Sequence, residues 1–128
     1  MKKVIFLFSL LLSGCYLANG SPGEMNFWVK DGKKISFEEY NVCAKEVFPS
    51  LGDRYIYLYK KKEQLGWIEF YKNKREAEEY DSYLSIAFKF VDKCLYDSGY
   101  RFRPPLIWCL AQDGNNTKIC IENMKYRN

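Results

Sequence analysis

The sequence contains no histidine. Imidazole is the usual general base of serine and cysteine hydrolases and the commonest metal ligand, so a Ser-His-Asp triad, a Cys-His pair and a histidine metal site are all excluded. No two cysteines have the C-x-x-C spacing of redox and zinc motifs, and the chain has no glycine-rich phosphate loop and no acidic calcium loop. The sequence therefore argues against an enzyme and predicts neither a cofactor nor a metal.

The composition is that of a small chain rich in aromatic residues. A length of 128 residues is typical of one small domain. Hydrophobic residues make up 48% and aromatic residues 18% of the chain, which is enough to form a packed core and argues against intrinsic disorder.

The N-terminus has the three parts of a secretory signal. Lys2 and Lys3 are followed by an apolar run over residues 4–12 that only Ser9 interrupts, and small residues close it. The run is too short to cross a bilayer core, which needs about 20 residues. A buried N-terminal helix or strand would not need two lysines in front of it. We therefore expect residues 1–14 to be a signal peptide.

The end of this segment, Leu12-Ser13-Gly14-Cys15, resembles the lipobox of bacterial lipoproteins. The resemblance implies that the Cys15 thiol receives a diacylglycerol, that residues 1–14 are removed, and that the new amino group is acylated by a chain such as palmitate. Tyr16 stands where an Asp would favour retention in the inner membrane, so the resemblance implies an outer-membrane protein held by N-terminal acyl chains. The resemblance does not indicate whether the protein lies on the periplasmic face or on the surface face of the outer membrane.

Cleavage before Cys15 would also change the charge. Removal of Lys2 and Lys3 lowers the net charge from +4 to about +2, which is no footprint of a nucleic-acid-binding protein. Residues 15–26 carry Asn, Gly, Ser and Pro and read as a lipidated N-terminus with a flexible tether. Residues 27–128 are then expected to form one small globular domain.

The remaining cysteines predict two disulfides. Lipidation of Cys15 leaves an even number in an exported chain, with three possible pairings among Cys43, Cys94, Cys109 and Cys120. If Gly114 and Asn115 form a two-residue hairpin loop, Cys109 faces Cys120 across the strands, and Cys43 is left to pair with Cys94. We therefore favour Cys43–Cys94 and Cys109–Cys120.

Two segments have clear helix signals. Ser36 and Glu39 form a capping box, and Asn73 with Glu76 can cap a second helix that ends before Gly99. The first helix has apolar residues at helical spacing, at Tyr40, Cys43, Ala44 and Val47. The second has an apolar stripe of Tyr80, Leu84, Ala87, Phe88, Val91 and Leu95, with Cys94 at its edge.

Two other segments look like hairpins. Residues 55–59 and 67–71 are strand-like in composition, and residues 60–66 between them can form a loop or a helical turn, so we favour a hairpin over residues 54–71. Residues 106–111 and 117–122 flank the turn-forming residues 113–116. The expected fold is an α+β single domain with two main helices linked by a disulfide and a C-terminal disulfide-bonded β-hairpin.

The mature chain also resembles a group of small cysteine-containing lipoproteins of Gram-negative bacteria. The shared positions are Trp28, Lys30, Ser36, Cys43, Cys94-Leu95, Gly99-Tyr100 and Cys109. Residues 51–71 depart from the compact members of the group. The group has no settled function, so the resemblance implies an architecture and no activity.

A cluster of aromatic residues is the one feature that predicts binding. Tyr55, Tyr57, Tyr59 and Trp67 lie in one segment beside residues 60–62, which are all lysine. Aromatic rings stack on sugars, and lysines suit an anionic glycan or a lipid headgroup. The other interpretation, which we favour, is that alternate tyrosines pack on the helices while the lysines solvate a turn. We expect Trp67 to be core and at least one tyrosine to lie on the surface.

These observations lead to one preferred function and one alternative. The preferred function is a non-enzymatic outer-membrane lipoprotein that binds an envelope glycan or protein, or has a structural role in the envelope, with no nucleic-acid partner. The alternative is an inhibitor or exclusion factor acting on a lytic enzyme or a phage component. A carboxylate-based cell-wall hydrolase is disfavoured, because the clustered glutamates lie at helix starts, where caps and solvation explain them.

Overall fold

The computed structural model describes residues 22–111 and 114–128. The expected signal peptide, Cys15 and residues 16–21 of the expected tether lie outside the described residues, as does Asp113 of the expected turn. The chain divides into two compact units. The terminal unit comprises the described residues up to Ile35 together with Tyr100–Asn128, and the central unit comprises Ser36–Gly99.

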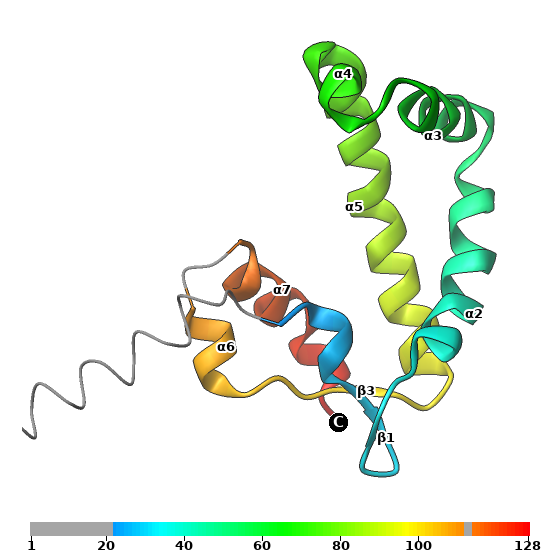
Figure 1. The fold of residues 1–128 in the computed structure, drawn as a ribbon. Coiled ribbons are helices and arrows are strands. Elements are labelled where there is room, and N and C mark those ends of the chain that lie inside the picture. The colour runs from blue at the N-terminus through cyan, green and yellow to red at the C-terminus, as the bar shows by residue number, and fades with distance from the viewer. Residues whose placement is uncertain (1–21, 112–113) are drawn as a thin grey trace, which may run out of the picture. The chain divides into compact units, whose positions relative to one another are not determined.

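The terminal unit contains a small antiparallel sheet (Figure 1). Strand β1 (Trp28–Lys30) pairs with β2 (Lys33–Lys34) on one side and with β3 (Arg101–Phe102) on the other. Between β1 and β2, Asp31 and Gly32 have φ values of 51° and 73°. Two consecutive residues in the left-handed region make the kind of two-residue turn for which Asp-Gly is favoured.

Aromatic side chains form the core of the terminal unit. Trp28, Phe102 and Trp108 are almost completely buried, and the Phe102 ring lies 5.3 Å from Trp28 and 6.2 Å from Trp108. The short 3-10 helix η1 (Glu24–Phe27) precedes β1, and the Trp108 Nε1 donates a hydrogen bond of 2.6 Å to the carbonyl of Pro22. Residues 22–26, part of the expected tether, thus contact the core of the terminal unit through Pro22.

The predicted C-terminal β-hairpin is wrong. The chain forms helix α6 (Leu106–Leu110) and helix α7 (Asn116–Asn123), followed by η3 (Met124–Tyr126). The strand prediction rested on β-branched and aromatic residues, whose preference depends on having a sheet surface to pack on. Pro105 instead stands at the start of α6, where its carbonyl accepts hydrogen bonds from the next turn.

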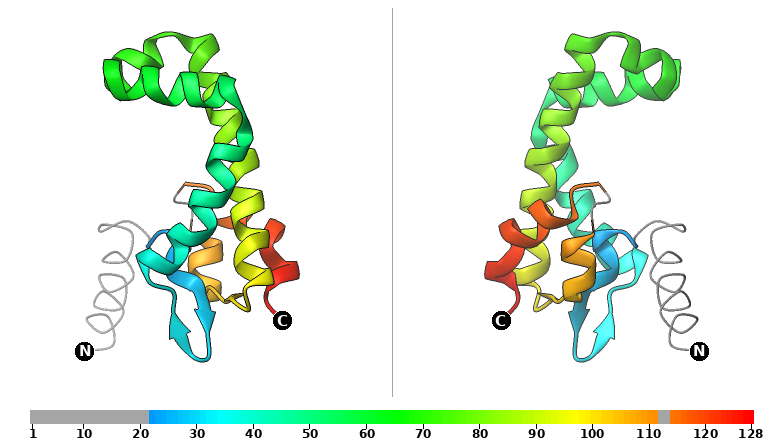
Figure 2. Two further views of the ribbon diagram at one scale, coloured as in Figure 1. Left: turned by 90° about the vertical axis from the view of Figure 1, so that its right-hand side faces the viewer. Right: turned by 90° about the vertical axis from the view of Figure 1, so that its left-hand side faces the viewer.

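The central unit is helical. Helix α2 (Phe37–Val47) and helix α5 (Lys74–Asp97) lie side by side (Figure 2). Between them the chain forms η2 (Phe48–Leu51), α3 (Asp53–Leu65) and α4 (Trp67–Lys72). Helices α3 and α4 lie at the end of the pair where α2 ends and α5 begins (Figure 1).

The predicted starts of α2 and α5 are confirmed. The Glu39 amide donates to Ser36 Oγ at 3.1 Å, and the Ser36 amide donates to Glu39 Oε2 at 2.8 Å, which completes the capping box. The Glu76 amide donates to the Asn73 side chain at 3.3 Å at the start of α5. These local contacts need no tertiary partner, which is why the sequence alone revealed them.

The predicted hairpin over residues 54–71 is wrong. Two glycines with positive φ, Gly52 at 99° and Gly66 at 80°, stand at the two ends of α3. Within α3 the buried residues Tyr55 and Leu58 have helical spacing, which outweighed the strand preference of the alternating tyrosines. The expected α+β class still holds for the part of the chain that the structure describes, which is mostly helical with a small three-stranded sheet.

Both predicted disulfide pairs are confirmed. Cys43 on α2 is bonded to Cys94 on α5, with a Cα–Cα distance of 5.8 Å. Cys109 on α6 is bonded to Cys120 on α7, with a Cα–Cα distance of 5.7 Å. Within the two described ranges, no helix is long and apolar enough to span a bilayer.

Candidate functional site

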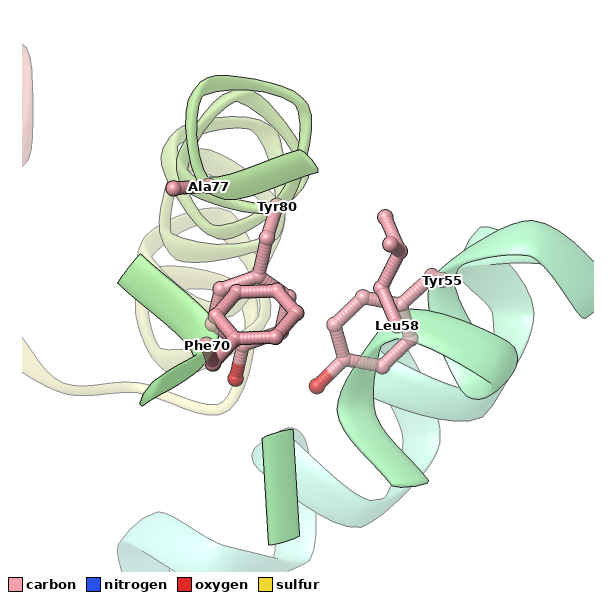
Figure 3. Close-up of a cluster of buried hydrophobic side chains, with 5 residues drawn as sticks. All are labelled: Tyr55, Leu58, Phe70, Ala77 and Tyr80. Carbon is pink, nitrogen blue, oxygen red and sulfur yellow. The ribbon is translucent and has the colours of Figure 1, made fainter. Parts of the chain in front are cut away.

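The four candidate aromatic residues of the sequence do not share one surface. Tyr55 lies in the core of the central unit (Figure 3). Its ring stacks on that of Tyr80, with centroids 5.9 Å apart and an interplanar angle of 6°. Leu58, Phe70 and Ala77 complete the buried cluster. Burial is the main cause that raises the pKa of Tyr55 to about 12. The structure thus gives Tyr55 a packing role.

Tyr57 lies on the surface between two cations. Its side chain is 50% exposed, and its ring centroid lies 5.2 Å from the Arg54 guanidinium and 5.9 Å from the Lys61 Nζ. Both cations are already paired. Arg54 donates two hydrogen bonds to Glu79, at 2.8 and 2.7 Å, and the Lys61 Nζ lies 2.6 Å from Glu76.

This network fastens α3 to α5. The hydrogen bonds from Arg54 hold the pKa of Glu79 below its ordinary value, and the bond to Glu79 raises the pKa of Arg54. Two cations face two carboxylates, so the group is balanced in charge. A balanced group attracts an anionic ligand poorly. The network is therefore better explained as a link between helices than as the expected anion site.

Tyr59 faces a different side of α3. Two residues correspond to about 200° of helical rotation, which separates Tyr59 from Tyr57. Tyr59 is 44% exposed, and its ring stacks on Tyr55 with centroids 6.2 Å apart. The Lys62 Nζ lies 5.7 Å from the Tyr59 ring. Tyr59 thus covers the edge of the core and lies on another side of the helix from Tyr57.

Trp67, expected in the core, is exposed. Its side chain is 68% accessible, and the neighbouring Ile68 and Tyr71 are also exposed. Phe70 is the only residue that α4 buries. Helix α4 has only six residues, and Phe70 is the one that packs in the core. Trp67, in the first turn, therefore remains in solvent.

The exposed residues of α4 contact one another and helix α5. The Trp67 and Tyr71 rings lie one turn apart, with centroids 6.3 Å apart. The Tyr71 hydroxyl donates a hydrogen bond of 2.6 Å to Asp81 on α5, which is the main cause that raises the pKa of Tyr71 to about 12. We call Trp67, Ile68, Tyr71 and Asp81 the α4 surface.

The α4 surface has the chemical groups that a sugar site needs. The apolar face of a sugar ring stacks on an exposed indole, and its hydroxyl groups pair with a carboxylate or a phenol. The sequence identified Trp67 but missed Ile68 and Asp81. Asp81 could not be found from local spacing, because its contact with Tyr71 depends on how α4 packs on α5.

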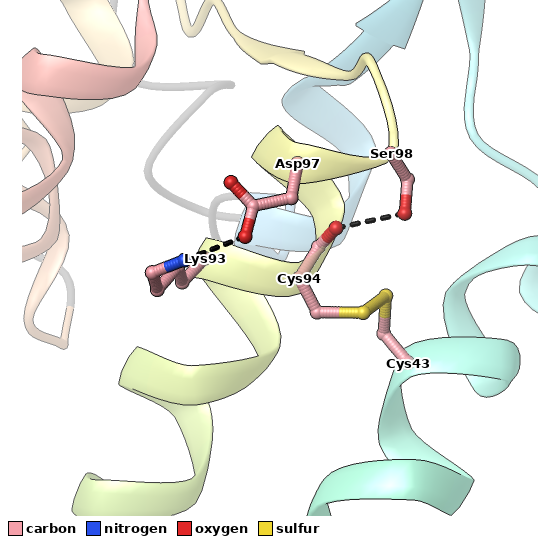
Figure 4. Close-up of a disulfide and its surroundings, with 5 residues drawn as sticks. All are labelled: Cys43, Lys93, Cys94, Asp97 and Ser98. Carbon is pink, nitrogen blue, oxygen red and sulfur yellow. Dashed lines mark hydrogen bonds and ion pairs between the residues drawn. A yellow bond between two sulfur atoms is a disulfide. The ribbon is translucent and has the colours of Figure 1, made fainter.

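A second candidate lies beside the Cys43–Cys94 disulfide (Figure 4). A shallow cavity of about 310 Å³ opens here between α2 and α5. At its edge the Lys93 Nζ lies 2.6 Å from Asp97, and the hydroxyl of Ser98, the residue after α5, donates to the Cys94 carbonyl at 2.8 Å. These contacts are local to the end of α5, and they support a structural role for the disulfide.

Among residues 22–111 and 114–128, no three His, Cys, Asp or Glu side chains are grouped closely enough to hold a metal ion. Cys15 lies outside the described residues. Comparison of the chain with protein families, with curated proteins and with solved structures finds no match. Within the described residues, the α4 surface is the site with the clearest ligand chemistry.

Proposed function

We propose that this chain is a lipid-anchored outer-membrane lipoprotein that acts as a non-enzymatic binding module of the cell envelope. Three observations support the proposal. The segment ending at Cys15 resembles a lipobox. The other four cysteines form two disulfides, as is usual in an oxidising compartment outside the cytoplasm. The sequence holds no histidine for the common hydrolytic mechanisms.

The exposure of Trp67 is the observation that points to binding. Full burial of a large apolar side chain such as Phe or Leu contributes about 1.5 to 3 kcal/mol, and folding gains little of this from Trp67. Trp67 and Ile68 stand together on one short helix. Grouped apolar side chains on a surface are typical of interaction sites.

The neighbours of Trp67 favour an envelope glycan as the ligand. The Tyr71 ring lies 6.3 Å from the indole, and its hydroxyl group donates a hydrogen bond that occupies one Asp81 oxygen. Since a carboxylate has two oxygens and about four acceptor sites, Asp81 can also accept hydrogen bonds from sugar hydroxyl groups. Stacking on Trp67 and hydrogen bonding to Asp81 are the two interactions that a neutral sugar ring requires.

A titration with solubilised envelope glycan fragments, followed by tryptophan fluorescence, tests this function. We expect the wild-type protein to bind and Trp67→Ala to lose binding. Phe37→Ala is the matched control, because Phe37 is an exposed aromatic residue of the same unit outside the α4 surface. Binding by ligand-detected NMR removes the dependence on the indole signal. A Trp67→Ala protein that binds as well as the wild type would contradict the proposal.

A further inference from the structure

Helix α6 turns three large apolar side chains outward. Leu106, Ile107 and Leu110 are 72%, 61% and 65% exposed. They span about 100° of the helix, while Trp108, the one buried residue of α6, points to the opposite side. These three side chains form an exposed apolar surface on a five-residue helix. Within the part of the chain that the structure describes, nothing covers this surface.

Tertiary contacts connect this surface to the segment that follows the expected lipid anchor. On the inner side of α6, the Trp108 ring packs 5.0 Å from Phe27, and its Nε1 donates to the Pro22 carbonyl. Pro22 is seven residues after Cys15. Seven extended residues reach at most about 24 Å. If Cys15 carries acyl chains, as the proposed function requires, α6 is held within a short distance of the bilayer surface.

The charge of the terminal unit fits an anionic membrane. From Cys15 onward, this unit has eight Lys or Arg against four Asp or Glu, a net charge of +4. The central unit has ten Lys or Arg against twelve Asp or Glu, a net charge of −2. The excess of positive charge is therefore in the unit that the anchor would hold at the membrane, where anionic headgroups attract it.

We infer that the terminal unit docks on the membrane that holds its anchor, with Leu106, Ile107 and Leu110 inserted at the interface of an anionic leaflet. Exposed aliphatic side chains beside positive charges are the pattern of interfacial membrane contacts. The inference rests on the proposed lipidation of Cys15. It adds a second contact with the lipid, made by the folded protein itself.

The test uses the full-length protein purified from membranes and reconstituted in vesicles of phosphatidylcholine and phosphatidylglycerol. A small share of the phosphatidylcholine carries a photoreactive diazirine in its acyl chain. After illumination, mass spectrometry maps the labelled peptides. We expect label on the peptide that contains residues 106–110. We expect the triple variant Leu106→Ser, Ile107→Ser, Leu110→Ser to lose this label down to the level of the central unit.

Val42→Ser is the matched control, because Val42 is an exposed aliphatic residue of the central unit, and it should leave the labelling of α6 unchanged. Circular dichroism and the intact Cys109–Cys120 disulfide verify that the variants are folded. An acylated protein whose α6 peptide stays unlabelled would overturn this inference alone. A purified protein without acyl chains would overturn the proposed lipidation and the docking together.

Discussion

The hydroxyl group of Tyr71 on α4 donates a 2.6 Å hydrogen bond to the Asp81 carboxylate on α5. The bond connects the helix that exposes Trp67 to the longest helix of the central unit. It therefore restrains Tyr71 against α5, and a restrained side chain loses less conformational freedom when a ligand binds.

Asp81→Asn tests this bond. The hydrogen bond to the carboxylate is the main cause of the raised Tyr71 pKa, and the negative charge of Asp81 adds to it. We expect the pKa of Tyr71 to fall from about 12 toward its ordinary value of 10. An NMR titration of labelled tyrosine side chains measures it. Asp97→Asn, which removes a carboxylate at the far end of α5, should leave the Tyr71 pKa unchanged.

Trp67 and Phe70 on the same helix should differ strongly in their effect on stability. Phe70 is fully buried, so Phe70→Ala should lower the free energy of unfolding by about 3 to 5 kcal/mol. Trp67 is mostly in solvent, so Trp67→Ala should change it by no more than about 0.5 kcal/mol. Urea unfolding measures both. Equal, large losses would show that Trp67 is part of the core.

The stability of the terminal unit should depend on pH through Glu24. Burial, with a smaller contribution from the charge of Glu122, raises the pKa of Glu24 above 4.5. The folded protein therefore binds this proton more tightly than the unfolded chain does, so the Glu24 contribution to stability is greatest below pH 4.5 and is lost as the pH rises through the folded pKa.

Glu24→Gln carries no charge, so it should remove the loss of stability that the wild type undergoes as Glu24 ionises. We expect the variant to have a higher melting temperature than the wild type at pH 7 and a similar one at pH 4. Glu122→Gln removes the smaller of the two causes and should have a smaller effect in the same direction. A Glu24→Gln protein that is less stable than the wild type at pH 7 would contradict the assigned burial.

The two disulfides should stabilise to different degrees. In the chain-entropy model, Cys43–Cys94, with a sequence separation of 51, contributes about 4 kcal/mol, and Cys109–Cys120, with a separation of 11, contributes about 3 kcal/mol. Paired substitutions to alanine, followed by urea unfolding, measure each contribution. A greater loss on removal of Cys109–Cys120 would show that loop length does not govern the effect here.

Local signals in the sequence predicted part of this fold. The caps at Ser36 and Asn73 depend on residues three positions apart, so they could be read directly. The pairing of Cys109 with Cys120 was also predicted, although through a hairpin that does not form. Helices α6 and α7 bring the same two cysteines within bonding distance, so the predicted pairing is correct although the predicted secondary structure is not.

Other features depended on tertiary packing. The alternating tyrosines at the start of α3 have strand-like composition, and only the burial of Tyr55 and Leu58 against α4 and α5 makes helical spacing decisive. Trp67 is exposed because Phe70 is the residue of α4 that packs in the core. The contact of Asp81 with Tyr71 has no local signature for the same reason.

The mass of the mature N-terminus tests the central claim most directly. The protein is extracted from membranes with detergent, digested, and its N-terminal peptide is analysed by mass spectrometry. The account predicts a peptide that begins at Cys15 and carries a diacylglycerol and an amide-linked acyl chain, and it predicts that Cys15→Ser stays unprocessed and unacylated. A peptide that begins at Met1, or at any residue other than Cys15, without acyl chains would contradict it.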